Sequence, residues 1–208
     1  MALKPRVGVF GGAFDPPHNT HVALARAALS QLRLRELRVL PTGHAWHKAR
    51  TLSDAADRVA MARLAFEPLG AVMVDARETL RSGPSYTLDT LRELRLEQPE
   101  VEWVLMLGTD QAAALPTWHG WQQILQIATV AVAERIDDAG QPIVFDPRSL
   151  PGLPAEARFE SLRIAPEDTS ATLIRQRAAQ GLDVAALVPP AVARYIEQHH
   201  LYSPPDEH

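Results

Sequence analysis

The sequence has no cysteine among its 208 residues, and this absence excludes several chemistries at once. Disulfide bonds, thiolate nucleophiles and zinc sites with cysteine ligands are all ruled out. Any reaction must therefore use histidine, lysine, arginine, acidic side chains, hydroxyl groups and backbone amides.

Long apolar runs and an excess of basic charge are also missing. No run of about 18 apolar residues occurs, and the N-terminal MALKPRVGVFGG lacks the apolar core of a signal peptide. Lysine and arginine number 21 against 25 acidic residues, which gives a net charge of −4, and both signs are interspersed. The sequence therefore predicts a cytoplasmic protein with no membrane or nucleic-acid partner, and it leaves a homo-oligomer open.

Short apolar runs alternate with longer segments of helical pattern. The predicted strands cover 7–10, 37–41, 71–75, 101–107, 128–133 and 159–165, and the predicted helices lie near 20–33, 53–66, 85–97 and 119–126. Strands that are apolar along their whole length and separated by helices indicate a parallel sheet covered on both faces. We therefore predict an α/β fold with a doubly wound, Rossmann-like sheet, in which ligands bind at the carboxyl ends of the strands.

A proline-rich segment interrupts the alternation near 137–158, where we expect an irregular surface connection within one domain that spans 1–208. A C-terminal helical part, 170–202, follows it. Ser170 suits a helix N-cap, Gly181 a helix end and Pro190 a first helical turn.

The stretch GGAFDPPHNTH, 11–21, joins the first predicted strand to the first predicted helix. Glycines there let a phosphate approach the backbone, although a glycine pair alone is also typical of an ordinary tight turn. His18 and His21 are three residues apart, which places both imidazoles on one side of the first helical turn. Each alone is compatible with a solvated side chain or a helix cap. Together, beside the positive end of the helix dipole, they predict a triphosphate site.

A second stretch, EDTSATLIRQR at 167–177, begins a later helix. The hydroxyls of Ser170 and Thr172 and the free N–H groups suit phosphate oxygens, and Arg175 adds a forked donor one turn on. Taken alone, the same residues fit a capped helix with a surface arginine.

The two stretches together resemble the nucleotide-binding motifs of the nucleotidyltransferase superfamily: a glycine pair with an H-x-G-H element, and a Ser/Thr-rich helix start ending in Ile-Arg. Four stretches between them resemble one branch, the bacterial nicotinate-nucleotide adenylyltransferases. They are HKA (47–49), GPSYTLDTL (83–91), LGTDQ (107–111) and LPTWHGW (115–121). The resemblance covers nearly the whole chain and is weakest in the proline-rich segment.

This resemblance implies an enzyme of NAD biosynthesis that joins ATP and nicotinate mononucleotide, releasing pyrophosphate. It implies Mg²⁺ bound through the ATP phosphates and no metal site made of protein residues. The implied ATP site comprises Gly11, Gly12, Phe14, His18, His21, Gly108, Asp110, Ser170, Thr172 and Arg175. The implied acceptor site comprises Lys48, Tyr86, Thr87, Trp118, His119 and Arg135, and the implied catalytic residues are His18, His21, Lys48 and Arg175.

Chemistry gives several of these residues a role. Lys48 suits a reacting phosphate, Trp118 suits stacking on a pyridine ring, and Asp110 suits a ribose hydroxyl. Without the resemblance the three fit a solvated lysine, a packing tryptophan and a helix cap. The resemblance places the nicotinate carboxylate on backbone amides near Tyr86 and Thr87 and near Trp118 and His119. A helix N-terminus prefers a carboxylate to a neutral carboxamide, which predicts a preference for nicotinate over nicotinamide.

Two other interpretations stay open. One is a sibling adenylyltransferase acting on another phosphorylated acceptor such as phosphopantetheine, against which Trp118 and the SYT element argue. The other is a regulatory module that binds nucleotide without turnover. A zinc site made of His44, His47 and His119 has no recognised ligand spacing.

Thr20 departs from the family pattern, which has glycine between the two histidines. Its branched Cβ adds bulk beside the expected nucleotide path and restricts the backbone. We expect weaker ATP binding rather than loss of activity.

Overall fold

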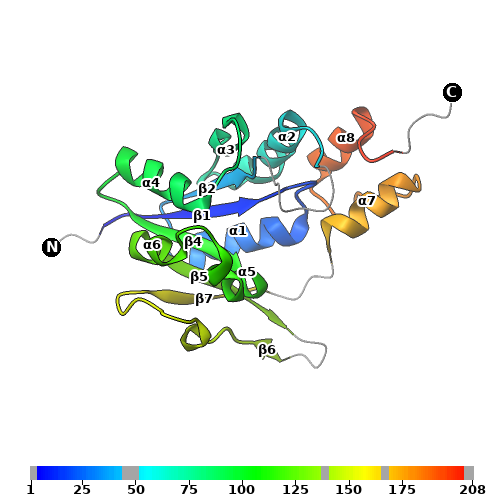
Figure 1. Cartoon of the computed structure of the whole chain (residues 1–208). Coiled ribbons are helices and arrows are strands. Elements are labelled where there is room, and N and C mark those ends of the chain that lie inside the picture. The colour runs from blue at the N-terminus through cyan, green and yellow to red at the C-terminus, as the bar shows by residue number, and fades with distance from the viewer. Residues whose placement is uncertain (1–3, 44–51, 137–140, 165–168, 204–208) are drawn as a thin grey trace.

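The computed structural model describes residues 4–43, 52–136, 141–164 and 169–203, and its core is a largely parallel sheet (Figure 1). The strands are β1 (Arg6–Gly12), β2 (Glu36–Pro41), β3 (Val72–Val74), β4 (Glu102–Gly108), β5 (Ala128–Ile136), β6 (Pro142–Ile143) and β7 (Phe159–Arg163). The order runs β3-β2-β1-β4-β5, with β7 parallel to β5 and the short β6 antiparallel to the end of β5.

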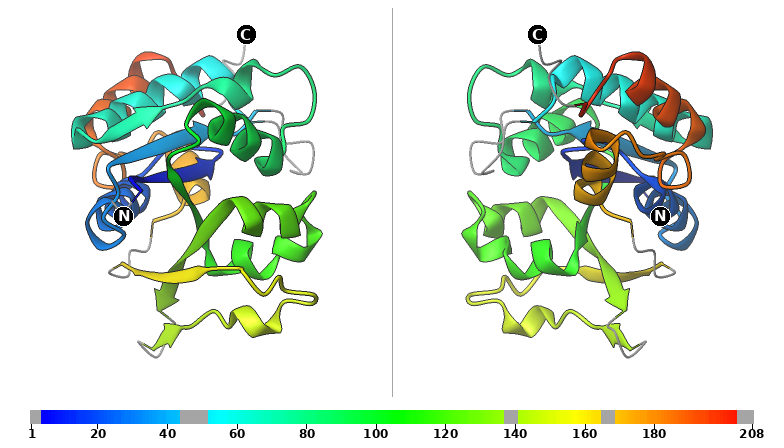
Figure 2. Two further views of the ribbon diagram at one scale, coloured as in Figure 1. Left: turned by 90° about the vertical axis from the view of Figure 1, so that its left-hand side faces the viewer. Right: turned by 90° about the vertical axis from the view of Figure 1, so that its right-hand side faces the viewer.

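Helices cover both faces of the sheet. They are α1 (Asn19–Gln31), α2 (Ala55–Phe66), α3 (Arg77–Leu80), α4 (Thr87–Glu97), α5 (Thr109–Ala113), α6 (Trp121–Ile127), α7 (Ala171–Ala179) and α8 (Pro190–Gln198), with 3₁₀ turns η1 (Glu67–Leu69), η2 (Leu115–Thr117) and η3 (Pro147–Ser149). Helices α1, α2, α7 and α8 share one core, and α4, α5 and α6 share the other. Figure 2 shows α1 in blue on the same side as α7 and α8 in orange and red, so both ends of the chain cover one face.

The packing of β4 on both of its faces explains why its sequence is apolar throughout. Trp103, Leu105 and Leu107 pack in the core under α4 and α6, whereas Val104 and Met106 pack in the core under α1 and α2. Successive side chains of a strand point to opposite faces, so a strand between two helical layers must be apolar at every position. This confirms the predicted doubly wound α/β fold.

The differences from the expected elements are local. Helices α3 and α5 and the 3₁₀ turns were not predicted, because elements of three to five residues are too short to show a helical period. The proline-rich segment is less irregular than expected, since it contains β6 and η3. Pro142 is tolerated because β6 lies at a sheet edge, where no N–H is needed from it.

The predicted helix ends are confirmed at three positions. Ser170 caps α7 by accepting a hydrogen bond from the Leu173 N–H at 3.2 Å. Gly181 follows α7 with a φ of 68°, the left-handed conformation that glycine adopts at helix ends. Pro190 begins α8.

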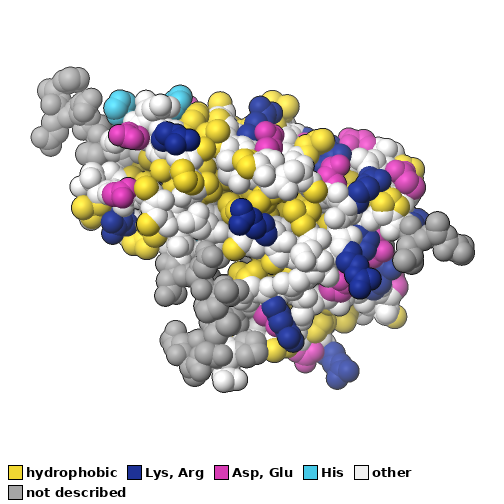
Figure 3. All heavy atoms as spheres, turned by 180° about the vertical axis from the view of Figure 1, so that it is seen from behind, with side chains coloured by type: hydrophobic (Ala, Val, Ile, Leu, Met, Phe, Trp, Pro, Cys, Tyr) yellow, Lys and Arg dark blue, Asp and Glu magenta, His cyan; other side chains and the backbone are white. Residues whose placement is uncertain are grey.

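Charged side chains of both signs lie on the surface. On the face in Figure 3, basic and acidic side chains are interspersed with apolar ones. Within the described residues, no helix combines the length and the apolar character needed to cross a membrane.

Candidate functional site

The predicted site lies where the strand order reverses, at the carboxyl ends of the central strands β1 and β4. Open α/β sheets bind ligands in the crevice at such a point. A Cβ added to Gly11 or to Gly108 would meet nothing within 4 Å, so the backbone is open to a ligand at both strand ends.

Gly12 makes room for a neighbouring ring. A Cβ there would lie 2.9 Å from the ring of Phe14, so glycine is needed at this position whether or not a ligand approaches its backbone. Phe14 itself is 2% exposed and packs edge-on against Phe10, Phe66 and His21, each with ring centroids 5.3 Å away. A contact between Phe14 and ATP is therefore limited to its backbone, because its ring supports His21 from the interior.

His18 and His21 lie together at the start of α1, as their spacing predicts. His18 is the N-cap residue, and the two ring centroids are 3.7 Å apart. The backbone N–H of His18 donates to Nδ1 of His21 at 3.2 Å. Because Nδ1 accepts, the single proton of a neutral His21 ring is carried by Nε2, which is left as a donor.

Burial keeps both imidazoles neutral near pH 7. It lowers the pKa of His18 to about 4, and burial together with the neighbouring His18 lowers the pKa of His21 well below its ordinary value. Nδ1 of His18 is buried, and within the described chain it has no hydrogen-bond partner. The pair therefore offers neutral hydrogen-bonding groups, while the helix N-terminus and Arg175 supply the positive potential.

Asp15 connects the loop between β1 and α1 to three distant parts of the chain. It is 1% exposed; its Oδ1 accepts the Tyr202 hydroxyl at 2.7 Å, and its Oδ2 accepts the Ser53 N–H at 3.2 Å. Its backbone carbonyl accepts Nη1 of Arg175 at 2.7 Å. Burial, and after it the charge of Asp15, raise the pKa of Tyr202, which keeps the phenol protonated as a donor.

A second support of this loop comes from Arg58, which is buried in α2. Its Nη1 donates to the carbonyls of Ala13 at 3.1 Å and Thr42 at 2.7 Å, and its Nε donates to the carbonyl of Ser53 at 3.0 Å. Sequence reasoning missed both Asp15 and Arg58. The only available signal was an acid inside the apolar turn GGAFDPP; an arginine in an amphipathic helix gives none.

The second motif meets the first through Arg175. Nη2 of Arg175 donates to the Thr172 hydroxyl at 3.0 Å while Nη1 reaches Asp15, which places the start of α7 beside the loop before α1. The segment after α7 reaches the same place, since the N–H of Asn19 donates to the carbonyl of Leu187 at 3.0 Å. The fold thus brings together two motifs about 150 residues apart in the sequence.

The expected acceptor residues come from two segments that the structure places in contact. Tyr86 is the N-cap residue of α4, and its ring lies 4.7 Å from that of His119, centroid to centroid. Gly120 has a φ of 62°, and a Cβ there would lie 2.3 Å from the side chain of Leu88, so the loop after Trp118 packs closely on α4. Trp118 is half-buried against the core under α4 and therefore also has a packing role. Thr87 follows Tyr86 as the first residue of α4.

Of three further expected residues, the structure describes the side chain of Asp110 alone. Asp110 is exposed in α5 at the end of β4, where Gly108 rather than Asp110 is the N-cap. Arg135 lies in β5 and its backbone pairs with Ile143; the structure does not describe its side chain. Lys48 lies outside the described residues, as do His44 and His47.

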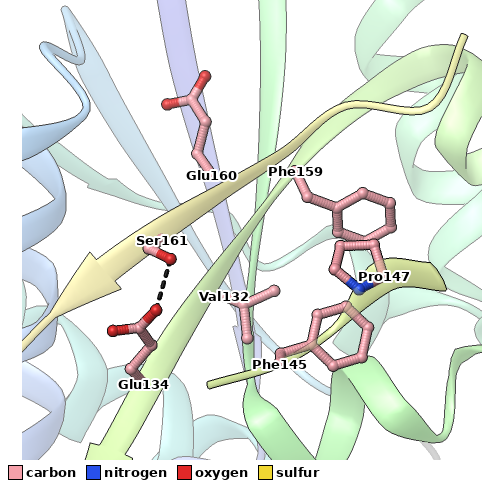
Figure 4. Close-up of a pocket in the computed structure, with 7 residues that line it drawn as sticks. All are labelled: Val132, Glu134, Phe145, Pro147, Phe159, Glu160 and Ser161. Atoms are coloured by element: carbon pink, nitrogen blue, oxygen red, sulfur yellow. Dashed lines mark hydrogen bonds between the residues drawn. The ribbon is translucent and has the colours of Figure 1, made fainter. Parts of the chain in front are cut away.

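A cavity of about 220 Å³ lies beside β5 and β7 (Figure 4). Its lining residues are Val132, Glu134, Phe145, Pro147, Phe159, Glu160 and Ser161. The buried Glu134 accepts the Ser161 hydroxyl at 2.5 Å, and the carboxylate of Glu160 points away from the two phenylalanine rings. Because a buried carboxylate repels phosphate, this cavity does not suit a polyphosphate.

Comparison with known proteins gives consistent results. Residues 9–177 match the family model described as cytidylyltransferase-like. A protein of Albidiferax ferrireducens named "Probable nicotinate-nucleotide adenylyltransferase" is 55% identical over 197 residues, covering 95% of this chain and 98% of the relative. A protein of Methylibium petroleiphilum with the same name is 43% identical over 204 residues, covering 96% and 93%.

The fold is shared with solved structures of lower identity. The Plasmodium falciparum nicotinic acid mononucleotide adenylyltransferase complexed with NaAD has a TM-score of 0.73 at 17% identity, covering 95% of this chain and 97% of that one. Its complex with APC gives a TM-score of 0.72 at the same identity and coverage.

Proposed function

The chain belongs to the cytidylyltransferase-like family and, within it, to the nicotinate-nucleotide adenylyltransferases of NAD biosynthesis, and we propose that it binds ATP at the β1–α1 loop and nicotinate mononucleotide beside α4. The observation that carries this proposal is the contact of Arg175 with Asp15, because it joins both nucleotide-binding motifs into one site at the switch point of the sheet. A cytoplasmic location belongs to the same proposal.

The phosphates of ATP lie, in this proposal, at the N-terminus of α1. Nε2 of His21 donates to a phosphate oxygen, since its Nδ1 is occupied by the His18 N–H. His18 completes the pair, and the open backbone at Gly11 lets the nucleotide approach β1. Arg175, with Ser170 and Thr172 at the start of α7, adds charge and hydroxyl groups from the other side.

The reaction is an in-line displacement at the α-phosphorus of ATP. A phosphate oxygen of nicotinate mononucleotide forms the new P–O bond, the bond to the bridging oxygen of the β-phosphate breaks, and pyrophosphate leaves. A phosphate that is mostly dianionic near pH 7 needs no general base, and neutral histidines suit donation to the oxygens on which charge develops. Lys48 is assigned to the reacting phosphates.

Mg²⁺ accompanies ATP and supplies charge neutralisation at its phosphates. Asp15, which lies within this loop, already accepts hydrogen bonds on both carboxylate oxygens, and the buried Nδ1 of His18 is a ligand type that Mg²⁺ disfavours. Among the described residues no group of three or more metal-ligating side chains is present. These donors fit an ion held chiefly by phosphates and water.

The acceptor base lies between α4 and the loop of Trp118. Within the described chain no side chain caps α4, so the N–H groups of Tyr86 and Thr87 are available to the nicotinate carboxylate. The rings of His119 and Tyr86 are in tilted contact at the edge of this region, and Trp118 offers a ring face for the pyridine. Asp110 is assigned to a ribose hydroxyl and Arg135 to the substrate.

A coupled assay tests the proposed function. Purified protein is incubated with ATP, Mg²⁺ and either nicotinate mononucleotide, nicotinamide mononucleotide or phosphopantetheine, and pyrophosphate release is measured. We expect the highest kcat/KM with nicotinate mononucleotide. A higher value with phosphopantetheine would indicate the sibling enzyme, and ATP binding without pyrophosphate release on any acceptor would indicate a regulatory module.

A further inference from the structure

A network of polar contacts joins α3 to α4 beside the proposed acceptor site. Arg81 lies just after α3, and its Nη1 donates to Ser85 Oγ at 2.5 Å and to Thr90 Oγ1 at 2.8 Å. Its Nη2 donates to Glu93 Oε2 at 2.7 Å. One guanidinium therefore connects the residue before the Tyr86 N-cap with two turns of the helix that follows.

The network is anchored in the interior. Thr90 is 1% exposed, and its hydroxyl donates to Glu78 Oε1 in α3 at 2.7 Å. The backbone of α3 in turn packs against Gly43 at the end of β2, where a Cβ would lie 2.1 Å from the Glu78 carbonyl oxygen. Helix α3, the end of β2 and the first half of α4 are thus fixed relative to one another.

The segment between Arg81 and α4 is exposed at 82–84, and Gly83 has a φ of 100°. The hydrogen bond from Arg81 holds the side chain of Ser85, the residue directly before the Tyr86 N-cap of α4. The direction in which the first N–H groups of α4 point depends on where this residue is held.

We propose that Arg81 is a positioning residue that sets the acceptor preference, because by holding Ser85 it aims the N-terminus of α4 at the ring carboxylate of nicotinate mononucleotide. This inference rests on the proposed function and deepens it. Loss of Arg81 weakens recognition of the carboxylate more than recognition of the ribose phosphate. A neutral carboxamide gains little from a helix N-terminus, so nicotinamide mononucleotide is affected less.

Arginine is required at position 81 because its planar guanidinium donates hydrogen bonds to three acceptors at once. A lysine at 81 keeps the charge, but its compact ammonium cannot reach Ser85, Thr90 and Glu93 in the same geometry. Arg81→Lys therefore separates the effect of geometry from that of charge.

The test compares Arg81→Met, Arg81→Lys and Ser85→Ala with Arg95→Met, a control that removes the same charge from an exposed position of α4. We expect KM for nicotinate mononucleotide to rise about tenfold in Arg81→Met, with kcat and KM for ATP within about twofold of wild type. The ratio of kcat/KM for nicotinate over nicotinamide mononucleotide falls by a similar factor. Arg81→Lys and Ser85→Ala give smaller changes in the same direction, and Arg95→Met gives none.

An unchanged ratio in Arg81→Met and Ser85→Ala, even with lower thermal stability, would overturn the inference and leave Arg81 a structural residue. If Arg81→Met does not fold, the ratio in Ser85→Ala decides alone. If the wild-type protein makes no dinucleotide from nicotinate mononucleotide, the proposed function and this inference are both wrong. If the wild type prefers nicotinate mononucleotide and the variants keep this preference, only the role proposed for Arg81 is wrong.

Discussion

The environment of His21 gives it one specific hydrogen-bonding role. Its Nδ1 is occupied by the His18 N–H, its ring packs against Phe14 and Phe10, and burial holds its pKa well below the ordinary value. It is therefore held as a neutral ring with Nε2 as its donor. Such a fixed donor stabilises charge that develops in a transition state without having to reorganise.

Replacing His21 by alanine tests this role. We expect His21→Ala to keep the fold and to lower kcat at least about a hundredfold, the loss typical of removing one preorganised donor. Pyrophosphate release measures kcat, and circular dichroism with a thermal melt checks the fold. A kcat near that of wild type would show that His21 does not contact the reacting phosphates.

Thr20 occupies the position between the two histidines where the resemblance leads us to expect glycine. It is the second residue of α1, and its Oγ1 is buried and has no hydrogen-bond partner within the described chain. The hydroxyl therefore does not point into solvent, and any effect of Thr20 on ATP binding has to come from the bulk of the side chain or from its oxygen.

Two substitutions separate these effects. We expect Thr20→Gly to lower KM for ATP about threefold because it removes the branched Cβ, and Thr20→Val, which keeps the bulk, to leave KM unchanged. Steady-state kinetics with varied ATP measures both. A higher KM in Thr20→Val would instead assign the hydroxyl to a phosphate contact, and an unchanged KM in Thr20→Gly would make the departure neutral.

At the scale of elements, the loop between β1 and α1 is held from the C-terminal end of the chain. The Tyr202 hydroxyl, just after α8, donates to the buried Asp15, and Arg175 of α7 donates to the carbonyl of the same residue. The loop that receives ATP in our proposal is thus fixed by segments that follow it by more than 150 residues in the sequence.

Removing the Tyr202 hydroxyl tests this connection. We expect Tyr202→Phe to lower the free energy of unfolding by about 2 kcal/mol, since a buried carboxylate loses a donor, and to raise KM for ATP more than KM for the acceptor. Urea denaturation and kinetics measure the two effects. Tyr195→Phe is the control, because its hydroxyl also donates to a carboxylate, that of Asp57, which lies in α2 and not in the loop. Equal changes of KM in both variants would refute a specific connection.

At the scale of the whole molecule, burial of His18 links folding to pH. Its pKa is about 4 in the folded protein against an ordinary value of 6.5 for a solvated histidine, so between these values the unfolded chain binds a proton that the folded chain does not. The contribution of His18 to stability is therefore complete above about pH 6.5, falls as the pH drops and is lost below about pH 4. His21 shifts in the same direction and adds to the slope.

We expect the free energy of unfolding to fall by on the order of 3 kcal/mol between pH 7 and pH 4 through His18 alone. Urea denaturation at a series of pH values measures this loss. His18→Asn cannot titrate and still suits an N-cap, so its curve should be flatter by that amount. Parallel curves for wild type and His18→Asn would mean that the pKa of His18 is the same in the folded and unfolded states.

Much of the fold could be predicted because parallel strands and amphipathic helices leave periodic patterns. The apolar run at β4 predicts a strand covered on both faces, and Ser170, Gly181 and Pro190 mark helix ends through their own conformational preferences. The short helices α3 and α5 and the strand β6 leave no such pattern, so only the structure reveals them.

The candidate site divides in a similar way. Gly11, His18 and His21 are recognisable because their chemistry and spacing are local. Gly11 lies at the end of β1, and the two histidines lie at the start of α1 as expected. By contrast, the support given by Arg58 and Tyr202 and the burial of the Phe14 ring against Phe66 depend on residues distant in sequence. No local pattern contains that information.

The sequence by itself determined the layered α/β architecture, the absence of thiol chemistry and the identity of the two motifs, because composition, period and spacing are properties of the chain alone. Only the tertiary structure decided that Arg175 meets Asp15, that both histidines are neutral and that Arg81 holds the start of α4. Burial sets the pKa of a side chain, and its hydrogen-bond partners set the direction in which it donates. This burial and these partners arise when the sheet brings distant segments into contact.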